Sequence, residues 1–420
     1  MNGGAGGRTV HYGWVVVVLC VVVIIGALGF GRFGYTVVLP GMKSGLGLEA
    51  VQAADLATAN MIGYLLFSVI GGVLSARFGA RMVISFFMLV VSASMLLCGL
   101  ARSYPAAVVA RTLTGIGSAG ANIPAMALVA VWFSRRTRGL ATGIAVSGAS
   151  IGLVVTGLVV PAIVAKVGPA GWRYAWFAFA AFTFLVAGIA FALLRNSPAD
   201  LGLAPVGTRE DRISQREVSD GVPGKPSLDW SLLYKSAQIW HLGGIYILFG
   251  FSYVIYATFF VEYLTSEAGF ALARAGSLWS AIGSVSIVSG FLWGTVSDRL
   301  GRKYGLFLVL LVQAAAYCLF GLWRSVPGFY LSAGLFALTA WSVPAIMAAA
   351  AGDLLGAVIA AAAFGFISLL LSVGQALGPF IAGRIVSAGG SYSGAFVAAS
   401  ASAALGAIAA LFLKVKAVQE

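Results

Sequence analysis

We predict an all-α membrane protein of twelve transmembrane helices in two bundles of six, and three observations carry this prediction. The 420 residues are 60% hydrophobic and 9% charged, with a mean hydropathy of +0.98, a balance that no water-soluble single-core domain of this length would have. The 55 glycines are scattered along the apolar stretches, which is typical of helices that pack closely through small residues. Apolar runs of about 20 residues, long enough to cross a bilayer, recur along the chain.

The boundaries of these runs are charges, glycines or prolines. The first six runs are Tyr12 to Leu39, Ala50 to Ser75, Met82 to Ala101, Ala106 to Phe133, Leu140 to Val164 and Trp172 to Leu194. A polar segment at 195–235 follows, whose prolines and mixed charges cannot bury a core, so it is predicted to be a linker. The second six runs are Ile239 to Leu264, Gly276 to Ser297, Tyr304 to Leu322, Phe329 to Ala351, Ala357 to Val386 and Tyr392 to Leu413. The expected domains are thus a bundle at 1–194, the linker at 195–235 and a bundle at 236–420.

The basic residues predict which side of the membrane each loop occupies. With the N-terminus in the cytoplasm, 17 lysines and arginines fall inside and 7 outside, which satisfies the positive-inside rule. We therefore expect a multi-pass membrane protein with both termini and the linker in the cytoplasm. Because this topology explains the net charge of +13, the bilayer is the expected partner and nucleic acid is not. Only Arg32 and Arg111 are left within spans.

Two loops of the chain repeat each other. The loop after the second span reads Gly72-Val-Leu-Ser-Ala76-Arg77-Phe-Gly79-Ala-Arg81, and the loop after the eighth reads Gly294-Thr-Val-Ser-Asp298-Arg299-Leu-Gly301-Arg-Lys303. Glycine, serine, arginine, glycine and a terminal base recur at a constant offset of 222 residues. The two halves are therefore predicted to be structural repeats.

These loops resemble the signature of the major facilitator superfamily, a Gly-x-x-x-Asp-Arg-x-Gly-Arg-Lys/Arg loop between spans two and three that often recurs between eight and nine. Four further stretches resemble its bacterial YbfB/YjiJ-type branch, which is distantly similar to monocarboxylate and oxalate/formate carriers. They are Gly31-Arg-Phe-Gly-Tyr35 with Leu39-Pro40, Ala59-Asn-Met-Ile-Gly-Tyr64, Thr339-Ala-Trp-Ser-Val-Pro344 and Gly374-Gln-Ala-Leu-Gly-Pro379.

The resemblance implies the major facilitator fold, a location in a bacterial inner (plasma) membrane and a conformational gate at the two loops. In the family, the loop aspartate caps or pairs with elements of the other half and helps to hold the outward-facing state. Asp298 can play this part, but Ala76 stands where the first copy needs the aspartate, so the gate is expected to rely on Asp298. The expected gate residues are Gly72, Arg77, Gly79, Arg81, Gly294, Asp298, Arg299, Gly301 and Lys303.

Arg32 is the strongest candidate for a substrate contact. A guanidinium within a span costs about 2.5–3.5 kcal/mol on insertion scales, so it normally faces a polar cavity or a partner. In a carrier of this fold, substrate residues are expected near the middle of several spans. The predicted substrate-binding residues are Arg32, Tyr35, Asn60, Tyr64, Asn122, Tyr253, Tyr256, Gln313, Tyr317, Trp341 and Gln375.

Each of these residue types also has an ordinary structural use. Tyrosine and tryptophan near span ends anchor helices at the interface, aromatic stripes pack helices together, and buried amides bond neighbouring helices. Arg111 lies in a stretch similar to the fourth-span Arg-x-x-x-Gly motif of the superfamily, which implies a structural or proton-linked role. The acids Asp55 and Glu262 fall near span ends, and they are the candidates for a coupling proton if there is one.

Two arginines and no central carboxylate favour an anion as the substrate. The expected function is secondary active transport of a small organic anion, such as a monocarboxylate, by alternating access. The alternatives are a drug or metabolite efflux carrier of the same fold and, in another class, a non-transporting membrane sensor. An enzyme is not expected, because the only histidines, His11 and His241, form no triad or metal cluster, and we expect a monomer without cofactor or metal.

Overall fold

The computed structural model describes residues 11–208 and 234–413. Within these ranges, eleven helices are long and apolar enough to cross a membrane, and a pair bent by 44° makes a twelfth if it is counted as one span. The predicted all-α membrane fold is therefore confirmed. Most of the predicted linker, at 209–233, and both chain ends lie outside the described residues.

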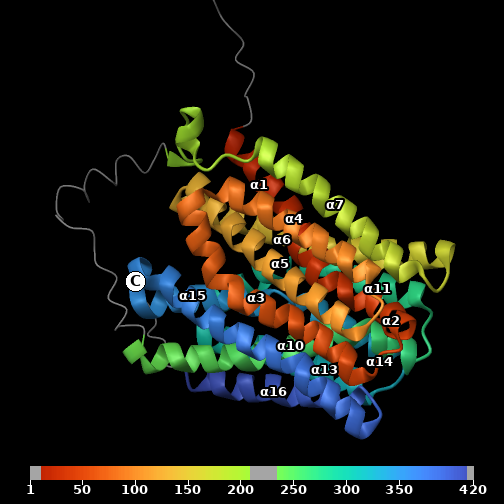
Figure 1. Cartoon of the computed structure of the whole chain (residues 1–420). Coiled ribbons are helices and arrows are strands. Elements are labelled where there is room, and N and C mark those ends of the chain that lie inside the picture. The colour runs from red at the N-terminus through yellow and green to blue at the C-terminus, as the bar shows by residue number, and fades with distance from the viewer. Residues whose placement is uncertain (1–10, 209–233, 414–420) are drawn as a thin grey trace, which may run out of the picture.

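The first half of the chain forms one bundle and the second half forms another beside it (Figure 1). The first bundle contains α1 (Tyr12–Ile24), η1 (Ile25–Phe33), α2 (Gly34–Leu46), α3 (Ala50–Phe78), α4 (Ala80–Leu100), α5 (Tyr104–Trp132), α6 (Arg135–Val167) and α7 (Gly171–Leu193). A short 3₁₀ helix, η2 (Pro198–Leu201), follows. The second bundle contains α10 (Ala237–Ser266), α11 (Leu272–Ser286), α12 (Ser289–Leu300), α13 (Arg302–Leu322), α14 (Val326–Thr339), α15 (Ser342–Gly389) and α16 (Ser393–Leu411).

Three pairs of helices join the two bundles: α3 with α15, α6 with α11, and α2 with α10. Glycine allows the backbones to approach closely there. A Cβ on Gly157 would lie 2.3 Å from the carbonyl oxygen of Gly276, and one on Gly383 would lie 2.4 Å from the Cβ of Ala54. We call the end of the molecule with the turns at 47–49, 101–103, 267–271 and 390–392 the outer end, and the end with the two repeated loops the loop end.

The first span is longer and less regular than predicted. It runs from Tyr12 to Leu46 rather than to Leu39, and its middle nine residues, Ile25–Phe33, form a π-helix. It ends at Gly47, which adopts a left-handed conformation with φ of +62°. A π-helical segment is rare and occurs mostly at functional sites, so this segment marks a special position in the span.

Two spans of the second half are broken near their middle, whereas continuous helices were expected. The eighth span bends by 44° between α11 and α12, and the tenth breaks between α14 and α15 at Ala340 and Trp341. Helix α15 then continues without interruption through the turn that was expected between spans ten and eleven. Irregular backbone at membrane depth needs other hydrogen-bond partners, and the site description below identifies them.

The first residues of the predicted linker pack against the first bundle. Val206 forms a parallel bridge with Phe133, exchanging backbone hydrogen bonds of 2.9 and 3.0 Å with Trp132 and Ser134. His11 Nε2 lies 3.0 Å from the carbonyl oxygen of Ala204. The part of the predicted linker that the structure describes before residue 209 is therefore attached to the first bundle.

Candidate functional site

Arg32 lies in the π-helical segment η1, which is held against α5 and α6. Gly29 makes the approach to α6 possible, because a Cβ there would lie 2.7 Å from the Cα of Gly152. Two donors from α5 satisfy carbonyls of the segment: Ser118 Oγ donates to Ala27 (2.6 Å) and Arg111 Nη1 donates to Gly31 (2.6 Å). The irregular turn that presents Arg32 is thus fixed by its neighbours.

Arg111 has the position of a structural residue. Its side chain is fully buried, donates to the first span, and lies 4.5 Å from the ring centre of Tyr35 and 5.6 Å from that of Trp176. Asn60 Nδ2 in turn donates to the carbonyl of Arg111 (3.2 Å). For Arg111, these contacts favour a structural role over a proton-linked one. The structural role stays a prediction.

The guanidinium of Arg32 faces the second half and has only neutral partners among the described residues. Its Nη2 donates to Gln375 Oε1 on α15 (2.5 Å) and to Met61 Sδ on α3 (2.8 Å). The cation lies 5.6 Å from the ring centre of Tyr64 and 5.8 Å from that of Phe33. Its Nε is buried without a hydrogen-bond partner. A charge held in this way is incompletely compensated.

Several other predicted residues gather around Arg32. Gln375 Nε2 donates to the hydroxyl of Tyr253 (2.7 Å), and Asn122 Nδ2 donates to the hydroxyl of Tyr64 (3.0 Å). Trp341 joins through Phe33, with ring centres 5.5 Å apart. We call this group the central cluster: Arg32, Tyr64, Asn122, Tyr253, Trp341 and Gln375. Both halves of the chain contribute to it, as a site between two rocking bundles requires.

Five predicted substrate contacts are not brought to this cluster. Tyr35 donates to the carbonyl of Ala53 (2.7 Å) instead of following Arg32, because the wide turn of the π-segment shifts the faces that a spacing of three would align. Tyr256 and Tyr317 pack in an aromatic core of the second bundle, with ring centres 5.0 Å apart. The other two, Asn60 and Gln313, donate to backbone carbonyls.

Gln313 supports the break in the tenth span. Its Nε2 donates to the carbonyl of Thr339, the last residue of α14 (3.0 Å), and Trp293 Nε1 donates to that of Leu338 (3.0 Å). The backbone N–H of Trp341 donates to Ser289 Oγ (3.2 Å), at the start of α12. Side chains of α12 and α13 therefore satisfy backbone groups at the break of the tenth span, and Ser342 Oγ donates in return to the carbonyl of Ser289 in the eighth (3.1 Å).

Sequence reasoning missed the serines that tie Trp341 to the first half. Trp341 Nε1 donates to Ser150 Oγ (2.8 Å), which lies 2.9 Å from Ser286 Oγ. Ser150 lies in the small-residue stretch Gly148-Ala-Ser-Ile-Gly152. That pattern is common in membrane helices, so the signal for its role was too weak to find.

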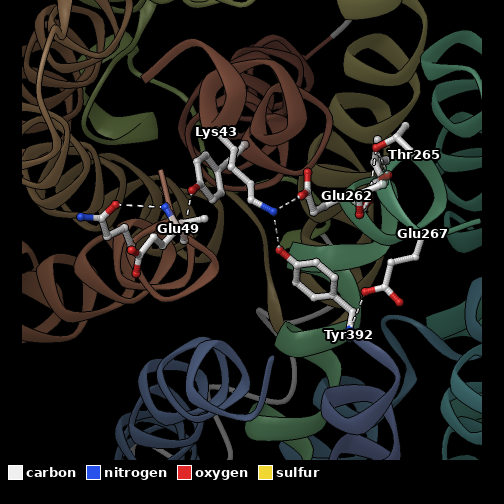
Figure 2. A network of polar contacts seen from close by, with 11 residues as sticks. Lys43, Glu49, Glu262, Thr265, Glu267 and Tyr392 are labelled. Atoms are coloured by element: carbon white, nitrogen blue, oxygen red, sulfur yellow. Dashed lines mark hydrogen bonds and ion pairs between the residues drawn. The ribbon is translucent and has the colours of Figure 1, made fainter. Parts of the chain in front are cut away.

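At the outer end, two ion pairs connect the bundles. Lys43 Nζ lies 2.7 Å from Glu262 Oε1, and Arg384 Nη1 lies 3.0 Å from Asp55 Oδ1. Figure 2 shows Lys43 pointing toward Glu262 and Tyr392 together. We call these two contacts the outer ion pairs; they contain both acids that were candidates for a coupling proton.

Tyr392 completes the first of the outer ion pairs. The ammonium of Lys43 lies 5.5 Å from its ring centre and 3.5 Å from its hydroxyl (Figure 2). Burial, with the nearby carboxylate of Glu262, raises the pKa of Tyr392, so the phenol stays protonated and neutral. The backbone N–H of Tyr392 also donates to Glu267 (2.7 Å), which holds its loop in place.

The repeated loops make their described polar contacts within their own halves. Arg81 Nε donates to the carbonyl of Phe191 (2.6 Å). Asp298 pairs with Arg302, whose Nε also contacts Asp353 Oδ2 on α15 (2.8 Å). The expectation that Asp298 contacts the first half is therefore not met in this conformation, because Arg302, four residues later on the next helix, is the nearer partner.

The glycines of the repeated loops divide into two kinds. Gly79 and Gly301 have φ of +83° and +88°, a region that favours glycine, so they form the tight turns between helices. A Cβ on Gly72 or Gly294 would meet no described atom within 4 Å. The remaining gate candidates, Arg77, Arg299 and Lys303, lie at this same loop end.

A small apolar cavity also lies at the outer end, but it is not the candidate site. Its volume is about 140 Å³, and its lining includes Val38, Val160 and Trp172. Neither Arg32 nor any other charged residue lines it. The donors that could bind a polar solute are in the central cluster.

Comparison with known proteins gives consistent results. The family model of the Major Facilitator Superfamily matches residues 19–290, and that of the "Uncharacterised MFS-type transporter YbfB" matches residues 225–411. The chain is 26% identical over 414 residues to the "Probable sulfoacetate transporter SauU" of Cupriavidus necator, covering 94% of this chain and 92% of that protein. It is 25% identical over 400 residues to the "Hexuronate transporter" of Bacillus subtilis, covering 90% of each.

A solved structure shows the same fold. The crystal structure of a bacterial homologue of the human lysosomal transporter Spinster superposes with a TM-score of 0.73 at 19% identity, covering 97% of this chain and 95% of that one. The resemblance noted in the sequence is therefore confirmed.

Proposed function

The chain belongs to the major facilitator superfamily, and from this membership we propose that it transports a small organic anion across the bacterial inner membrane by alternating access. Its relatives are transporters rather than enzymes. The two relatives named above are described as carriers of sulfoacetate and of hexuronates, both of which bear a carboxylate. We infer the same substrate class here and place the carboxylate against Arg32.

One observation carries this proposal: Arg32 is a membrane-embedded cation between the two bundles whose described partners are all neutral. A carboxylate would supply the missing counter-charge through charge-assisted hydrogen bonds, which are roughly twice as strong as neutral ones. Arg32, Tyr64 and Asn122 also keep part of their surface exposed, and we propose that the solute contacts them there. Tyr64 and Phe33 would pack against the body of the substrate.

The contacts between the bundles support alternating access. At the outer end the bundles meet through the outer ion pairs and through the glycine contacts of α6 with α11. At the loop end, Gly72 on α3 and Gly294 on α12 face open space as far as the described atoms extend. We therefore propose that the outer end is closed in this conformation and that the substrate enters from the loop end, the predicted cytoplasmic side.

The proposal predicts selective stabilisation by carboxylates. Purified wild-type protein in detergent is expected to melt at a higher temperature with at least one of sulfoacetate, D-glucuronate and L-lactate, because binding to the folded state alone stabilises it. The measurement is thermal unfolding over a range of concentrations, with sodium chloride at equal ionic strength as the control. Stabilisation only by lipophilic cations such as tetraphenylphosphonium would reject an anion carrier and favour the efflux alternative.

A further inference from the structure

We propose that Gln375 is a built-in competitor of the substrate, occupying the position on Arg32 that a carboxylate oxygen takes. The inference rests on the proposed function. Gln375 would lower the affinity for the substrate carboxylate, and its displacement would link substrate binding to the separation of the two bundles. A primary amide has nearly the same shape as a carboxylate but no charge. Its Oε1 accepts a hydrogen bond from Arg32 Nη2 (2.5 Å).

The orientation of Gln375 is held from behind. Its Nε2 donates to the hydroxyl of Tyr253 on α10 (2.7 Å), so the oxygen is turned toward Arg32. Gln375 and Tyr253 are each 4% exposed, and both belong to the second bundle. The amide is therefore a fixed part of that bundle.

The hydrogen bond of Arg32 to Gln375 crosses from one bundle to the other. While it is intact, it adds to the contacts that hold the observed conformation. A carboxylate that binds Arg32 replaces a neutral acceptor with a charged one, because hydrogen bonds to an ionised acceptor are stronger. The exchange breaks the inter-bundle bond and transfers Arg32 to the substrate, which removes one contact that opposes separation of the bundles.

The competition predicts opposite effects for two substitutions at one position. Gln375→Met removes the acceptor at nearly constant volume, and the affinity for the carboxylate is expected to rise roughly three- to tenfold, the value of one net hydrogen bond. Gln375→Glu places a permanent carboxylate on Arg32, and anion binding is expected to be lost. A residue that only packed helices would weaken binding or leave it unchanged in both variants.

The test is isothermal titration calorimetry, which measures the dissociation constants of sulfoacetate, D-glucuronate and L-lactate from the full-length protein in detergent. Thermal unfolding of each variant checks that it is folded. Gln52→Met is the control: it removes the amide of a glutamine at the outer end, which accepts from the backbone N–H of Glu49 (3.0 Å) and lies outside the central cluster, and it is expected to keep wild-type affinity.

The outcomes separate this inference from the proposed function. If the wild type binds one of the acids and Gln375→Met binds it no more tightly, or Gln375→Glu still binds it, the competitor role is wrong and the anion carrier stands. If neither the wild type nor Gln375→Met binds any of the three acids, both fall together.

Discussion

Replacing Arg32 with glutamine is expected to lower the affinity for a carboxylate roughly ten- to hundredfold, because a hydrogen bond to a charged group contributes about 1.5–3 kcal/mol. The melting temperature should stay the same or rise, since Arg32 has no carboxylate partner among the described residues and its burial is costly. Arg32→Lys keeps the charge but loses the planar, two-pronged donor geometry, so an intermediate affinity is expected.

The affinities are measured by isothermal titration with the acid that stabilises the wild type most. Arg324→Gln serves as the control, because this arginine lies at the outer end, where it donates to Ser391 and Ser393. Unchanged affinity in Arg32→Gln would move the carboxylate site away from the central cluster. A variant that fails to fold would instead assign Arg32 to the structure of the first span.

Replacing Lys43 with methionine is expected to open the outer end. Glu262 has only 3% of its side chain exposed, and leaving a buried charge without its partner typically costs 3–5 kcal/mol. Conformations that separate the bundles there and hydrate Glu262 should gain population at the expense of the observed one. The charge exchange Lys43→Glu with Glu262→Lys should restore the wild-type populations of the closed and open conformations.

The second outer ion pair is expected to matter less. Asp55→Asn should have a small effect, since Arg384 is 43% exposed and exposed pairs contribute about 0–1 kcal/mol.

The measurement is labelling of Thr36→Cys by a membrane-impermeant maleimide, in a background where Cys20, Cys98 and Cys318 are replaced by alanine. Thr36 is 2% exposed and donates to the carbonyl of Ala257 across the two bundles, so its site is covered while the outer end is closed. Labelling should become at least roughly tenfold faster in Lys43→Met, which corresponds to about 1.4 kcal/mol. Equal labelling rates in Lys43→Met and the parent would show that Lys43 and Glu262 do not hold the outer end closed.

The membrane fold could be predicted from the sequence because the bilayer leaves few choices. Every backbone group in lipid needs an internal partner, so long apolar runs form helices, and their number follows from counting them. The repeated loop, with its glycines at a constant offset, indicated two related halves. Gly79 and Gly301 show the physical basis, since both form the same positive-φ turn.

The interruptions of the spans could not be predicted from hydropathy. The π-segment at Ile25–Phe33 and the break at Trp341 each lie inside a run that is apolar enough overall to count as one span, so hydropathy does not mark them. Each depends on distant hydrogen-bond partners: the donors Arg111 and Ser118 for the first, and the donor Gln313 with the acceptor Ser289 for the second. These partners are known only once the helices are packed.

Only part of the central cluster could be predicted from the sequence, because its contacts also join residues that are far apart in the chain. The cost of a charge within a span singled out Arg32 directly, and the polar and aromatic residues within the other spans supplied the further candidates. Which of them face Arg32 depends on contacts between residues far apart in the chain, such as Gln375, 343 positions away. Tyr35, only three positions away, lies elsewhere because the π-segment changes the helical phase.

The central claim is that the protein recognises the negative charge of its substrate at Arg32, and the most direct test compares an acid with its uncharged amide. Proteoliposomes that contain the wild-type protein are loaded with unlabelled D-glucuronate or L-lactate, and uptake of the same acid in labelled form is measured. Excess unlabelled acid, glucuronamide or lactamide is added outside as the competitor. We expect exchange of at least one acid, competition by that acid and little competition by its amide. Equal competition by acid and amide, or an unchanged apparent affinity for the acid in Arg32→Gln, would contradict the account.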